Sequence, residues 1–252
     1  MSTEIKAIFF DIGGTLVSKA NSPRRDLNVI SKMVELVNET CTPLELEERI
    51  LAGDTRYKAW RSRSFRELAP EDRWPKFLLP DLPNEVVSRN ASTLQALWSE
   101  SRGIKKVLPE AEATLQELAK RGYVLGTISH TSPKHLESTG VLTLFKTIIY
   151  GSEFGWRKPH PAPFLAAARQ SAVLPQECAY VGDRPSRDVI GAREAGFGMV
   201  IQLKLSSEST ESDPCPMQPD LVLNNLAELL GAFPGVMADL NKTGPKKIEP
   251  LL

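Results

Sequence analysis

The chain is predicted to fold as a doubly wound α/β domain into which an all-helical domain is inserted. Three features of its 252 residues predict this. An apolar run at 5–10 ends in Asp11 and two glycines, residues 21–106 show helical patterns without a strand pattern, and strand and helix patterns alternate from residue 107 onward. Strands that alternate with helices in this way are typical of parallel sheets with right-handed crossovers.

The first strand is expected at 5–10, where β-branched and aromatic residues predominate. Gly13 and Gly14 break the strand, so the chain turns there. Asp11 therefore stands at the carboxyl end of a strand, the edge where open α/β sheets bind their ligands. This makes Asp11 a candidate nucleophile or metal ligand, although an Asp at a turn can also simply cap it.

The inserted domain should follow a polar linker and consist of helices. Capping residues and apolar spacing predict helices at 26–39, 42–65 and 84–102. Prolines interrupt regularity between residues 69 and 83, where the apolar residues Trp74, Phe77, Leu78 and Leu79 must be partly buried. Because the insertion begins a few residues after Asp11, we expect it to act as a lid over the sheet edge.

After the insertion, strands and helices should alternate. Strands are expected at 123–129, 146–151, 178–182, 199–203 and 220–223, and helices at 109–122, after 133, at 161–172, 186–196 and 226–230. We further expect a mobile loop at 206–219 and a flexible tail at 241–252. The core domain then comprises residues 1–17 and 107–252, and the cap comprises 18–106.

Composition excludes several classes of protein. Lys plus Arg equals Asp plus Glu at 31 each, so net charge suggests neither a nucleic-acid nor a membrane partner. No run reaches the roughly 18 apolar residues of a membrane span, and the N-terminus lacks a signal-peptide pattern. The 3 cysteines are odd in number and widely spaced, which favours a reducing, cytoplasmic location. The sequence does not indicate an oligomeric state.

Polar side chains follow several of the predicted strands and should meet at one edge of the sheet. They are Asp11, Ser129, Lys158, Asp183 and Asp188. Clustered carboxylates repel each other unless a cation lies between them, and hard oxygen ligands suit Mg²⁺. A lysine supplies positive charge to a phosphate, and a serine hydroxyl can hold a phosphoryl oxygen. These are the parts needed for phosphoryl transfer to an aspartate.

The order of these residues resembles the haloacid dehalogenase superfamily over nearly the whole chain. Its first motif, Asp-x-Asp-Gly-Thr after a strand, corresponds to Asp11-Ile-Gly-Gly-Thr15, and its strand-end Ser or Thr corresponds to Ser129. Its Lys before Pro corresponds to Lys158, and its Gly-Asp with a second Asp corresponds to Asp183 and Asp188. The resemblance implies a Rossmann-like core and the helical cap of the superfamily's first structural class.

The resemblance also implies roles. Asp11 would be the nucleophile and a magnesium ligand, the backbone carbonyl of Gly13 a second ligand and Asp183 a third. Asp188 would hold a metal-bound water or orient the site, and Ser129 and Lys158 would bind the transferring group. The predicted protein is a magnesium-dependent hydrolase of a small phosphorylated metabolite that passes through an aspartyl phosphate.

Gly13 departs from the phosphatase pattern, which has a general-acid Asp there. Glycine cannot transfer a proton, and general acid–base catalysis is typically worth about 10²–10⁴ in rate. The substrate could have a good leaving group, such as an acyl phosphate, or His130 could act as acid or base. His130 could equally be a strand-end imidazole bonded to the backbone.

Other chemistry also stays open because of Gly13. Phosphonatases have Ala at that position, and Gly is close to Ala, but they also need a cap lysine for a Schiff base. The cap offers Lys32, Lys58 and Lys76, none of which has a distinguishing context. Dehalogenases have Tyr there and lack the acids matched by Asp183 and Asp188. A further alternative is a weakened member that binds a phosphorylated ligand or a partner without turnover.

Substrate-binding residues cannot be assigned from the sequence. The basic cap segment at 56–66 could offer Arg56, Arg61 or Arg63 to an anionic substrate tail. It could equally be a solvated helix face with Trp60 in the core of the cap.

Overall fold

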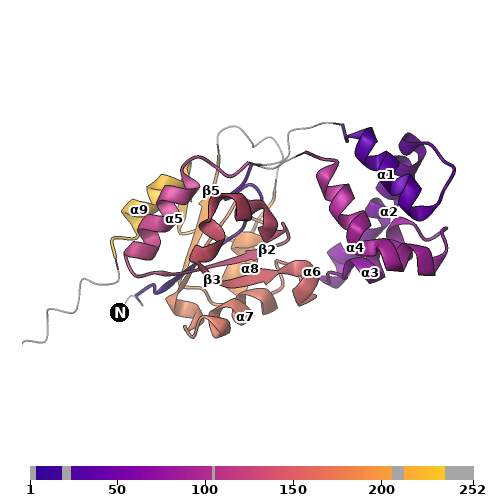
Figure 1. Ribbon diagram of the computed structural model, residues 1–252. Coiled ribbons are helices and arrows are strands. Elements are labelled where there is room, and N and C mark those ends of the chain that lie inside the picture. The colour runs from indigo at the N-terminus through magenta and orange to yellow at the C-terminus, as the bar shows by residue number, and fades with distance from the viewer. Residues whose placement is uncertain (1–3, 19–23, 104–105, 206–212, 236–252) are drawn as a thin grey trace, which may run out of the picture.

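A computed structural model of the chain describes residues 4–18, 24–103, 106–205 and 213–235. The predicted tail at 241–252 lies outside these ranges, as does the first half of the predicted loop at 206–219. Figure 1 shows the sheet and its covering helices at the left, and the helices of the insertion grouped together at the right. The arrangement confirms an α/β core with a helical insertion between its first two strands.

The core contains a parallel sheet with 6 strands in the order β3-β2-β1-β4-β5-β6. The strands are β1 (Ala7–Phe10), β2 (Val124–Ser129), β3 (Phe145–Tyr150), β4 (Cys178–Gly182), β5 (Met199–Leu203) and β6 (Leu221–Leu223). The strand order reverses between β1 and β4, where Ala7 pairs with Cys178. Ligands of doubly wound sheets bind beyond the carboxyl ends of the strands at such a reversal.

Helices cover both faces of this sheet. They are η2 (Pro133–Thr139), η3 (Val141–Leu144), η4 (Pro175–Glu177) and η5 (Leu226–Glu228), all 3₁₀, and α5 (Ala111–Lys120), α6 (Gly151–Phe154), α7 (Ala162–Gln170), α8 (Asp188–Glu194) and α9 (Leu229–Ala232). Side chains of β1 alternate between the two faces. Ile8 and Phe10 pack on the side of α5 and α9, whereas Ala7 and Phe9 pack on the side of α7 and α8. All four are fully buried, so β1 is the centre of the core.

The cap is a helical bundle with its own apolar core. Its elements are α1 (Leu27–Val37), α2 (Pro43–Ser64), α3 (Pro70–Arg73), the π-helical turn η1 (Trp74–Leu78) and α4 (Asn84–Glu100). The predicted starts are confirmed, because Asp26 caps α1 and Thr42 forms a capping box with Glu45 at α2. The segment 69–83, expected to be irregular, instead contains α3 and η1. Burial of Trp74 and Leu78 in the cap core accounts for this local order.

Two chain segments connect the cap to the core, and they pair with each other. Val17 forms an antiparallel bridge with Val107. Ser18 N–H donates to the Lys106 carbonyl at 2.8 Å, and Leu108 N–H donates to the Leu16 carbonyl at 2.9 Å. The cap therefore leaves and re-enters the core through a paired stem beside the end of β1.

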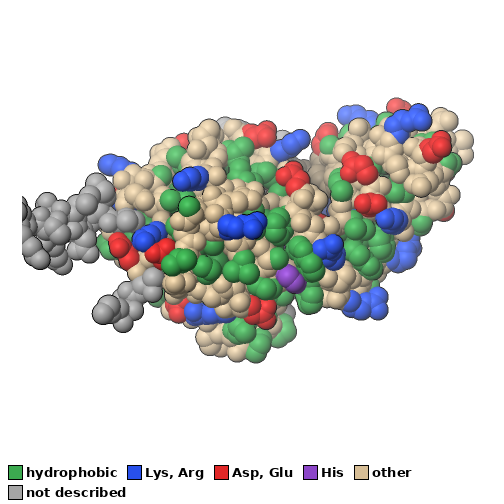
Figure 2. Space-filling view, turned by 90° about the horizontal axis from the view of Figure 1, so that it is seen from below, with side chains coloured by type: hydrophobic (Ala, Val, Ile, Leu, Met, Phe, Trp, Pro, Cys, Tyr) green, Lys and Arg blue, Asp and Glu red, His purple; other side chains and the backbone are tan. Residues whose placement is uncertain are grey.

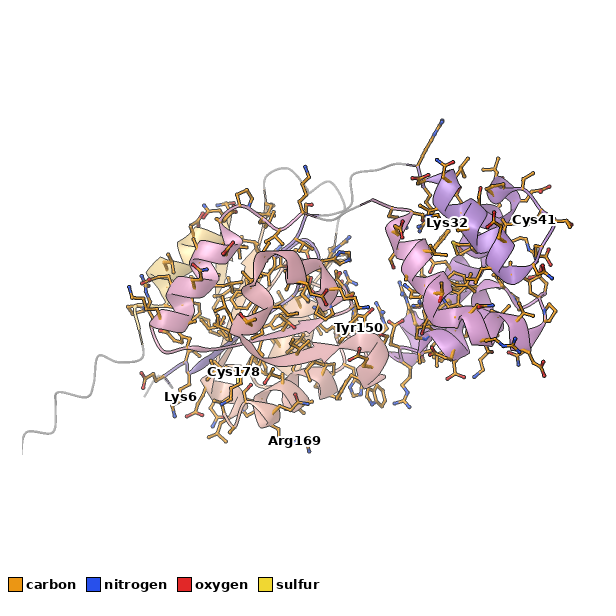
Figure 3. All side chains as sticks on the ribbon, in the orientation of Figure 1. Lys6, Lys32, Cys41, Tyr150, Arg169 and Cys178 are labelled. Carbon is orange, nitrogen blue, oxygen red and sulfur yellow. The ribbon has the colours of Figure 1, made fainter. Side chains whose placement is uncertain are left out.

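The charged side chains and the cysteines are spread over the molecule. Figure 2 shows acidic and basic side chains interspersed over the face in view, without a large area of one sign. Figure 3 shows Cys41 in the cap far from Cys178 in the core, and all 3 cysteines are free thiols. Within the ranges that the structure describes, no helix is both long and apolar enough to cross a bilayer.

Candidate active site

The carboxyl edge of the sheet brings Asp11, Ser129 and Lys158 into contact. Ser129 Oγ donates to Asp11 Oδ1 at 3.0 Å, and Lys158 Nζ donates to the same oxygen at 2.7 Å. All three side chains are buried, and Asp11 retains 8% exposure. Because both contacts fall on Oδ1, they fix the orientation of the carboxylate.

The Ser129 hydroxyl has its full set of hydrogen bonds. Its oxygen accepts from the N–H groups of Ile12 at 3.3 Å and Thr131 at 3.0 Å while its hydrogen is donated to Asp11. A hydroxyl has one donor hydrogen and two acceptor lone pairs, so this arrangement uses all of them. Ser129 thus ties the loop after β1 to the end of β2 and orients Asp11.

Lys158 lies at the centre of the buried charges. Its ammonium group contacts Asp11 at 2.7 Å, Asp188 Oδ1 at 2.6 Å and the Tyr180 hydroxyl at 2.6 Å. The Lys158 ammonium group therefore lies between the Asp11 and Asp188 carboxylates and offsets their negative charges. Because the lysine is buried at 4% exposure, removing any one of these partners would leave an uncompensated buried charge.

Asp188 holds Lys158 in place from the first turn of α8. Its Oδ1 contacts the ammonium group, and its Oδ2 accepts from Arg184 N–H at 2.9 Å. A Cβ on Gly182 would overlap the Asp188 carboxylate, so this close approach requires glycine at the end of β4. These contacts fix the Asp188 carboxylate beside Lys158.

Tyr180 is part of the cluster, although no sequence pattern distinguishes it from other core residues. Its hydroxyl donates to the Ile128 carbonyl at 2.9 Å and accepts from Lys158. Burial, then the negative charges of Asp188 and Asp11, raises the pKa of Tyr180, which stays a neutral phenol. Alternation along β4 places Tyr180 on one face, but only the fold shows that Lys158 reaches the same face.

Asp183 lies next to this cluster, immediately after β4. Its carboxylate is 3.8 Å from the Arg184 guanidinium, at the outer limit of an ion pair. Among the described residues, no group of 3 or more His, Cys, Asp or Glu side chains is arranged to hold a metal ion. The predicted ligand set of Asp11, Asp183 and the Gly13 carbonyl contains only two such side chains, so it remains a prediction.

The loop after β1 is tight and places Gly13 in a backbone conformation open to other residues. The N–H groups of Leu16 and Val17 both donate to the Ile12 carbonyl at 2.9 Å. Gly14 has φ of 84°, which favours glycine, but Gly13 is not among the positive-φ residues. A side chain at position 13 therefore meets no left-handed backbone strain.

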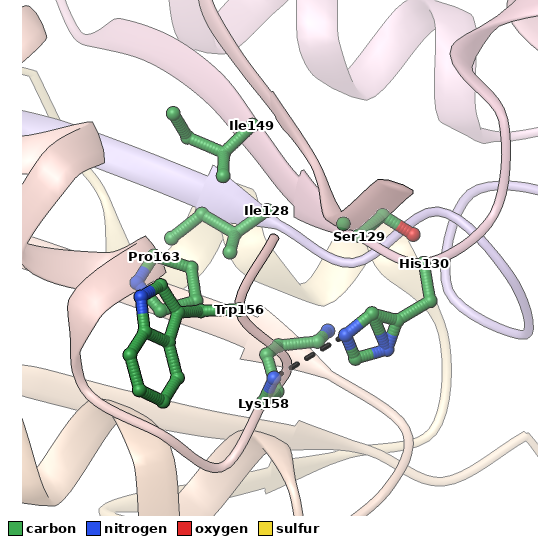
Figure 4. Close-up of a pocket in the computed structure, with 8 residues that line it drawn as sticks. Ile128, Ser129, His130, Ile149, Trp156, Lys158 and Pro163 are labelled. Carbon is green, nitrogen blue, oxygen red and sulfur yellow. Dashed lines mark hydrogen bonds between the residues drawn. The ribbon is translucent and has the colours of Figure 1, made fainter. Parts of the chain in front are cut away.

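His130 is held as a hydrogen-bond acceptor. Its Nε2 accepts from Lys158 N–H at 3.2 Å, as the dashed line in Figure 4 shows. Burial of the imidazole, then the positive charges of Lys158 and Arg187, holds the pKa of His130 well below its ordinary value. His130 is thus a neutral imidazole whose Nε2 is already bonded to the backbone.

A small pocket opens beside Lys158. Figure 4 shows Lys158 between Trp156 and His130, with apolar side chains of β2 and β3 above them. The Trp156 ring stacks on His160 with centroids 4.0 Å apart, and the Arg66 guanidinium lies 4.3 Å from the Trp156 centroid. A side chain of the cap therefore covers a wall of the core pocket.

The cap contacts the core next to Lys158 through a short backbone pairing, here named the cap–core bridge, which joins 65–67 to 155–157. Arg66 and Trp156 form an antiparallel bridge. Arg157 N–H donates to the Phe65 carbonyl at 2.8 Å, and Glu67 N–H donates to the Gly155 carbonyl at 3.1 Å. The bridge ends one residue before Lys158, so it ties the cap to the segment that carries this lysine.

A buried ion pair strengthens the cap–core bridge. The guanidinium of Arg157 contacts the carboxylate of Glu67, and Tyr57 O–H donates to Glu67 at 2.6 Å. Arg73 lies 3.5 Å from the same carboxylate. Burial, then the charges of Arg61 and Arg187, lowers the pKa of Arg157 to about 9. Two guanidinium groups, those of Arg157 and Arg73, therefore surround the single carboxylate of Glu67.

The basic residues of the cap differ in their surroundings. Arg56 and Arg63 are exposed and donate to the carbonyls of Phe77 and Ala59. Arg61 is partly buried, with its guanidinium 5.4 Å from the centroid of the Tyr57 ring. Among the three, only Arg61 is partly buried.

The cap lysines give no support to Schiff-base chemistry. Lys32, Lys58 and Lys76 are exposed. Lys58 and Lys76 form ion pairs within their own helical segments, with Asp54 and Asp72 respectively, at 2.8 Å.

A doubly wound sheet with an inserted helical cap, and a carboxylate, a serine and a lysine in contact at its carboxyl edge, is the arrangement of a hydrolase with a Rossmann-like core and a cap. The chain belongs to the family of haloacid dehalogenase-like hydrolases, whose pattern matches residues 5–196. The predicted family and enzyme class are thereby confirmed.

Relatives and solved structures agree with this assignment. A glyceraldehyde 3-phosphate phosphatase of Methanopyrus kandleri is 29% identical over 90% of this chain and 96% of its own length. A phosphoglycolate phosphatase of Haemophilus influenzae is 27% identical over 91% of this chain and 99% of its own length. A phosphoserine phosphatase of Thermus thermophilus is 37% identical over 48% of this chain and 51% of its own length.

The crystal structure of a predicted phosphoglycolate phosphatase from Haemophilus somnus has a TM-score of 0.57, at 21% identity over 92% of this chain and 99% of its own. That of a 2-haloacid dehalogenase from Pseudomonas syringae has a TM-score of 0.59, at 24% identity over 90% of this chain and 97% of its own. Phosphatases and dehalogenases share this fold, so the choice between their chemistries depends on the site residues.

Proposed function

We propose that this protein is a magnesium-dependent phosphatase of a small phosphorylated metabolite and acts through an aspartyl phosphate. The observation that carries the proposal is the convergence of Ser129 and Lys158 on Oδ1 of Asp11. Both contacts leave Oδ2 as the oxygen that attacks phosphorus. The phosphatases named for glyceraldehyde 3-phosphate, phosphoglycolate and phosphoserine support this substrate class.

Lys158 has two tasks in this proposal. In the free enzyme its ammonium group stabilises the buried Asp11 carboxylate. When a phosphoryl group is bound, the same charge offsets the negative charge of the equatorial oxygens. Asp188 and Tyr180 keep Lys158 in position, and Ser129 keeps Asp11 aimed at phosphorus.

The oxygen donors at this edge suit Mg²⁺. Asp11 and Asp183 offer hard carboxylate oxygens at the ends of adjacent strands, and the Gly13 carbonyl supplies a third oxygen donor. Asp188 is engaged by Lys158 and Arg184 N–H, so we assign it to orientation and not to direct coordination. Bound Mg²⁺ would supply positive charge against the carboxylates and the phosphoryl group.

Gly13 leaves the site without the usual proton donor, and His130 is a poor replacement. A general acid must carry a proton at working pH, but the lowered pKa of His130 keeps its imidazole neutral. Its Nε2 also points its lone pair at the Lys158 N–H. We therefore infer that the enzyme favours substrates whose leaving group needs little protonation, such as acyl phosphates.

Turnover of two leaving groups tests this function. An acyl phosphate and a simple alkyl phosphomonoester are assayed with and without Mg²⁺ for the wild type, Gly13→Asp and Gly13→Asn. Gly13→Asp should raise alkyl phosphate turnover by roughly 10²-fold, because it adds a positioned acid, and should change acyl phosphate turnover much less. Gly13→Asn adds a side chain of nearly the same shape that has no acidic proton, so it should give no such gain.

The nucleophile is tested in the same assay. Asp11→Asn should lower both activities by at least about 10⁴-fold, since the attacking oxygen is lost. If Gly13→Asp and Gly13→Asn behave alike on the alkyl phosphate, the missing-acid explanation is wrong. If the wild type turns over no member of the panel, the protein is a binding member of the family.

A further inference from the structure

The imidazole of His130 is fixed in a place from which it reaches the backbone of Lys158. His130 directly follows β2, and its Nε2 accepts from the Lys158 N–H at 3.2 Å (Figure 4). The ring lies against Gly151, which directly follows β3. A Cβ on Gly151 would come within 2.8 Å of His130 Cδ2, so only glycine leaves room for the ring in this position. His130 is thus held between the ends of two strands, with Nε2 directed at Lys158.

The residues just before Lys158 are bonded to the cap and not to the sheet. Residues 155–157 pair with 65–67 of the cap in the cap–core bridge. Lys158 is the first residue beyond this pairing, and its N–H donates to His130, which belongs to the core. The hydrogen bond to His130 therefore ties the backbone of Lys158 to the core at the point where the segment leaves the cap.

The position of the Lys158 ammonium group depends on where its backbone is held. In the free enzyme this group contacts Asp11, Asp188 and the Tyr180 hydroxyl. A phosphoryl group bound at Asp11 competes for the same ammonium group, and a lysine side chain is long and flexible. Misplacement of a group that acts on the reacting atoms by about 1 Å can cost about 10²-fold in rate. A fixed backbone limits such misplacement while the contacts of the ammonium group change.

We propose that His130 is a positioning residue that anchors the backbone of Lys158 to the core, so that the ammonium group stays at Asp11 during phosphoryl transfer. The inference rests on the proposed phosphatase function and deepens it. The anchor needs a hydrogen-bond acceptor at Nε2 and no proton transfer, so the neutral imidazole carries its proton on Nδ1. The lowered pKa of His130, which burial of the ring causes first, agrees with a neutral imidazole.

Two amide substitutions test the anchor because they differ in reach. Oε1 of a glutamine is as many bonds from Cα as Nε2 of a histidine, whereas Oδ1 of an asparagine is one bond closer. His130→Leu removes the acceptor altogether. With acetyl phosphate and Mg²⁺, His130→Leu and His130→Asn should lower kcat by about 10- to 100-fold with little change in KM, as expected when a group acting in the transition state is misplaced. His130→Gln should keep kcat within about threefold of the wild type, because its oxygen accepts from the same N–H.

His160→Leu is the matched control. His160 Nδ1 accepts from the Ala162 N–H at 3.1 Å, so this substitution removes a bond of the same kind and leaves the bond to Lys158 in place. It should keep the wild-type kcat. Thermal melts set an assay temperature at which every variant is folded, so lost folding is not counted as lost turnover. Because glutamine cannot transfer a proton, recovery in His130→Gln also separates positioning from acid–base catalysis.

NMR tests the anchor without any reaction. Long-range proton–nitrogen spectra of the wild type at neutral pH should show His130 with its proton on Nδ1, and the signals that vanish in His130→Gln identify this ring. The Lys158 N–H should be protected from hydrogen exchange in the wild type and in His130→Gln, and less protected in His130→Asn.

The outcomes separate the anchor from the reaction. A proton on Nε2 of His130, or equal kcat in the Gln and Asn variants, overturns the proposal, and this comparison decides even if His130→Leu does not fold. If the wild type hydrolyses no acetyl phosphate while the NMR results are as expected, the anchor stands and the proposed phosphatase function fails.

Discussion

The carboxyl edge of the core and the cleft-facing part of the cap hold their charges in opposite ways. In the core, Asp11, Lys158 and Asp188 are buried in direct contact, with distances of 2.6 and 2.7 Å. In the cap, Arg61 is only partly buried, and its guanidinium lies 5.4 Å from the centroid of the Tyr57 ring. The core cluster is complete before substrate arrives, so it suits a fixed chemical step.

The cap–core bridge lies between these extremes. Glu67 is buried among Arg157, Tyr57 and Arg73, and the pairing of 65–67 with 155–157 ends one residue before Lys158. A change in cap position therefore has a direct backbone route to the lysine that neutralises Asp11. Each of the following predictions tests the strength of one part of this comparison.

The largest effect is expected from Lys158→Met. The substitution leaves the Asp11 and Asp188 carboxylates buried without their common counter-ion, which should lower the free energy of unfolding by about 3–5 kcal/mol. Urea denaturation measures the change. Lys146→Met is the control, since Lys146 is exposed on β3 and its loss should cost less than about 0.5 kcal/mol. Equal effects of the two substitutions would contradict the central role of Lys158.

The cap–core bridge should show an intermediate effect in a double-mutant cycle. Glu67→Gln and Arg157→Gln, alone and together, should give a coupling free energy of about 1–3 kcal/mol, because the pair is buried and shares a hydrogen-bond network. The exposed pair Lys76 and Asp72 provides the comparison, with an expected coupling of about 0.3–0.5 kcal/mol. A bridge coupling no larger than that of the exposed pair would show that the cap is only loosely held.

The smallest effect concerns His130 and pH. Its pKa is lower in the folded protein than the ordinary value of about 6.5 expected when unfolded. The unfolded chain therefore binds a proton first as pH falls. The contribution to stability is complete above about pH 6.5 and is lost below it, by up to about 1.4 kcal/mol per pH unit.

His130→Asn removes this titration. Urea denaturation of both proteins is measured between about pH 7.5 and about pH 5, a range around the ordinary histidine pKa of about 6.5. The variant should lose stability less steeply than the wild type as the pH falls. Parallel curves would mean that His130 is protonated in the folded state, which would return it to consideration as the catalytic acid.

Much of the core could be predicted from the sequence because its signals are local. The apolar run before Asp11 and the alternating strand and helix patterns depend on neighbouring residues. They led to Asp11 and Ser129 at strand ends and to Lys158 ahead of a helix. The caps at Asp26 and Thr42 likewise depend on side chains that reach the first turn of their own helices. Short-range geometry of this kind is read directly from residue order.

The contacts that give the site its character were decided only by the tertiary structure. Lys158 and Asp11 are 147 residues apart in the sequence, and Arg157 and Glu67 are 90 apart. No periodicity indicated that Tyr180 would share Lys158 with two carboxylates, or that Arg61 would be partly buried while Arg63 is exposed. These pairings depend on strand order and on how the cap packs against the core, because side chains distant in sequence meet only when both are fixed.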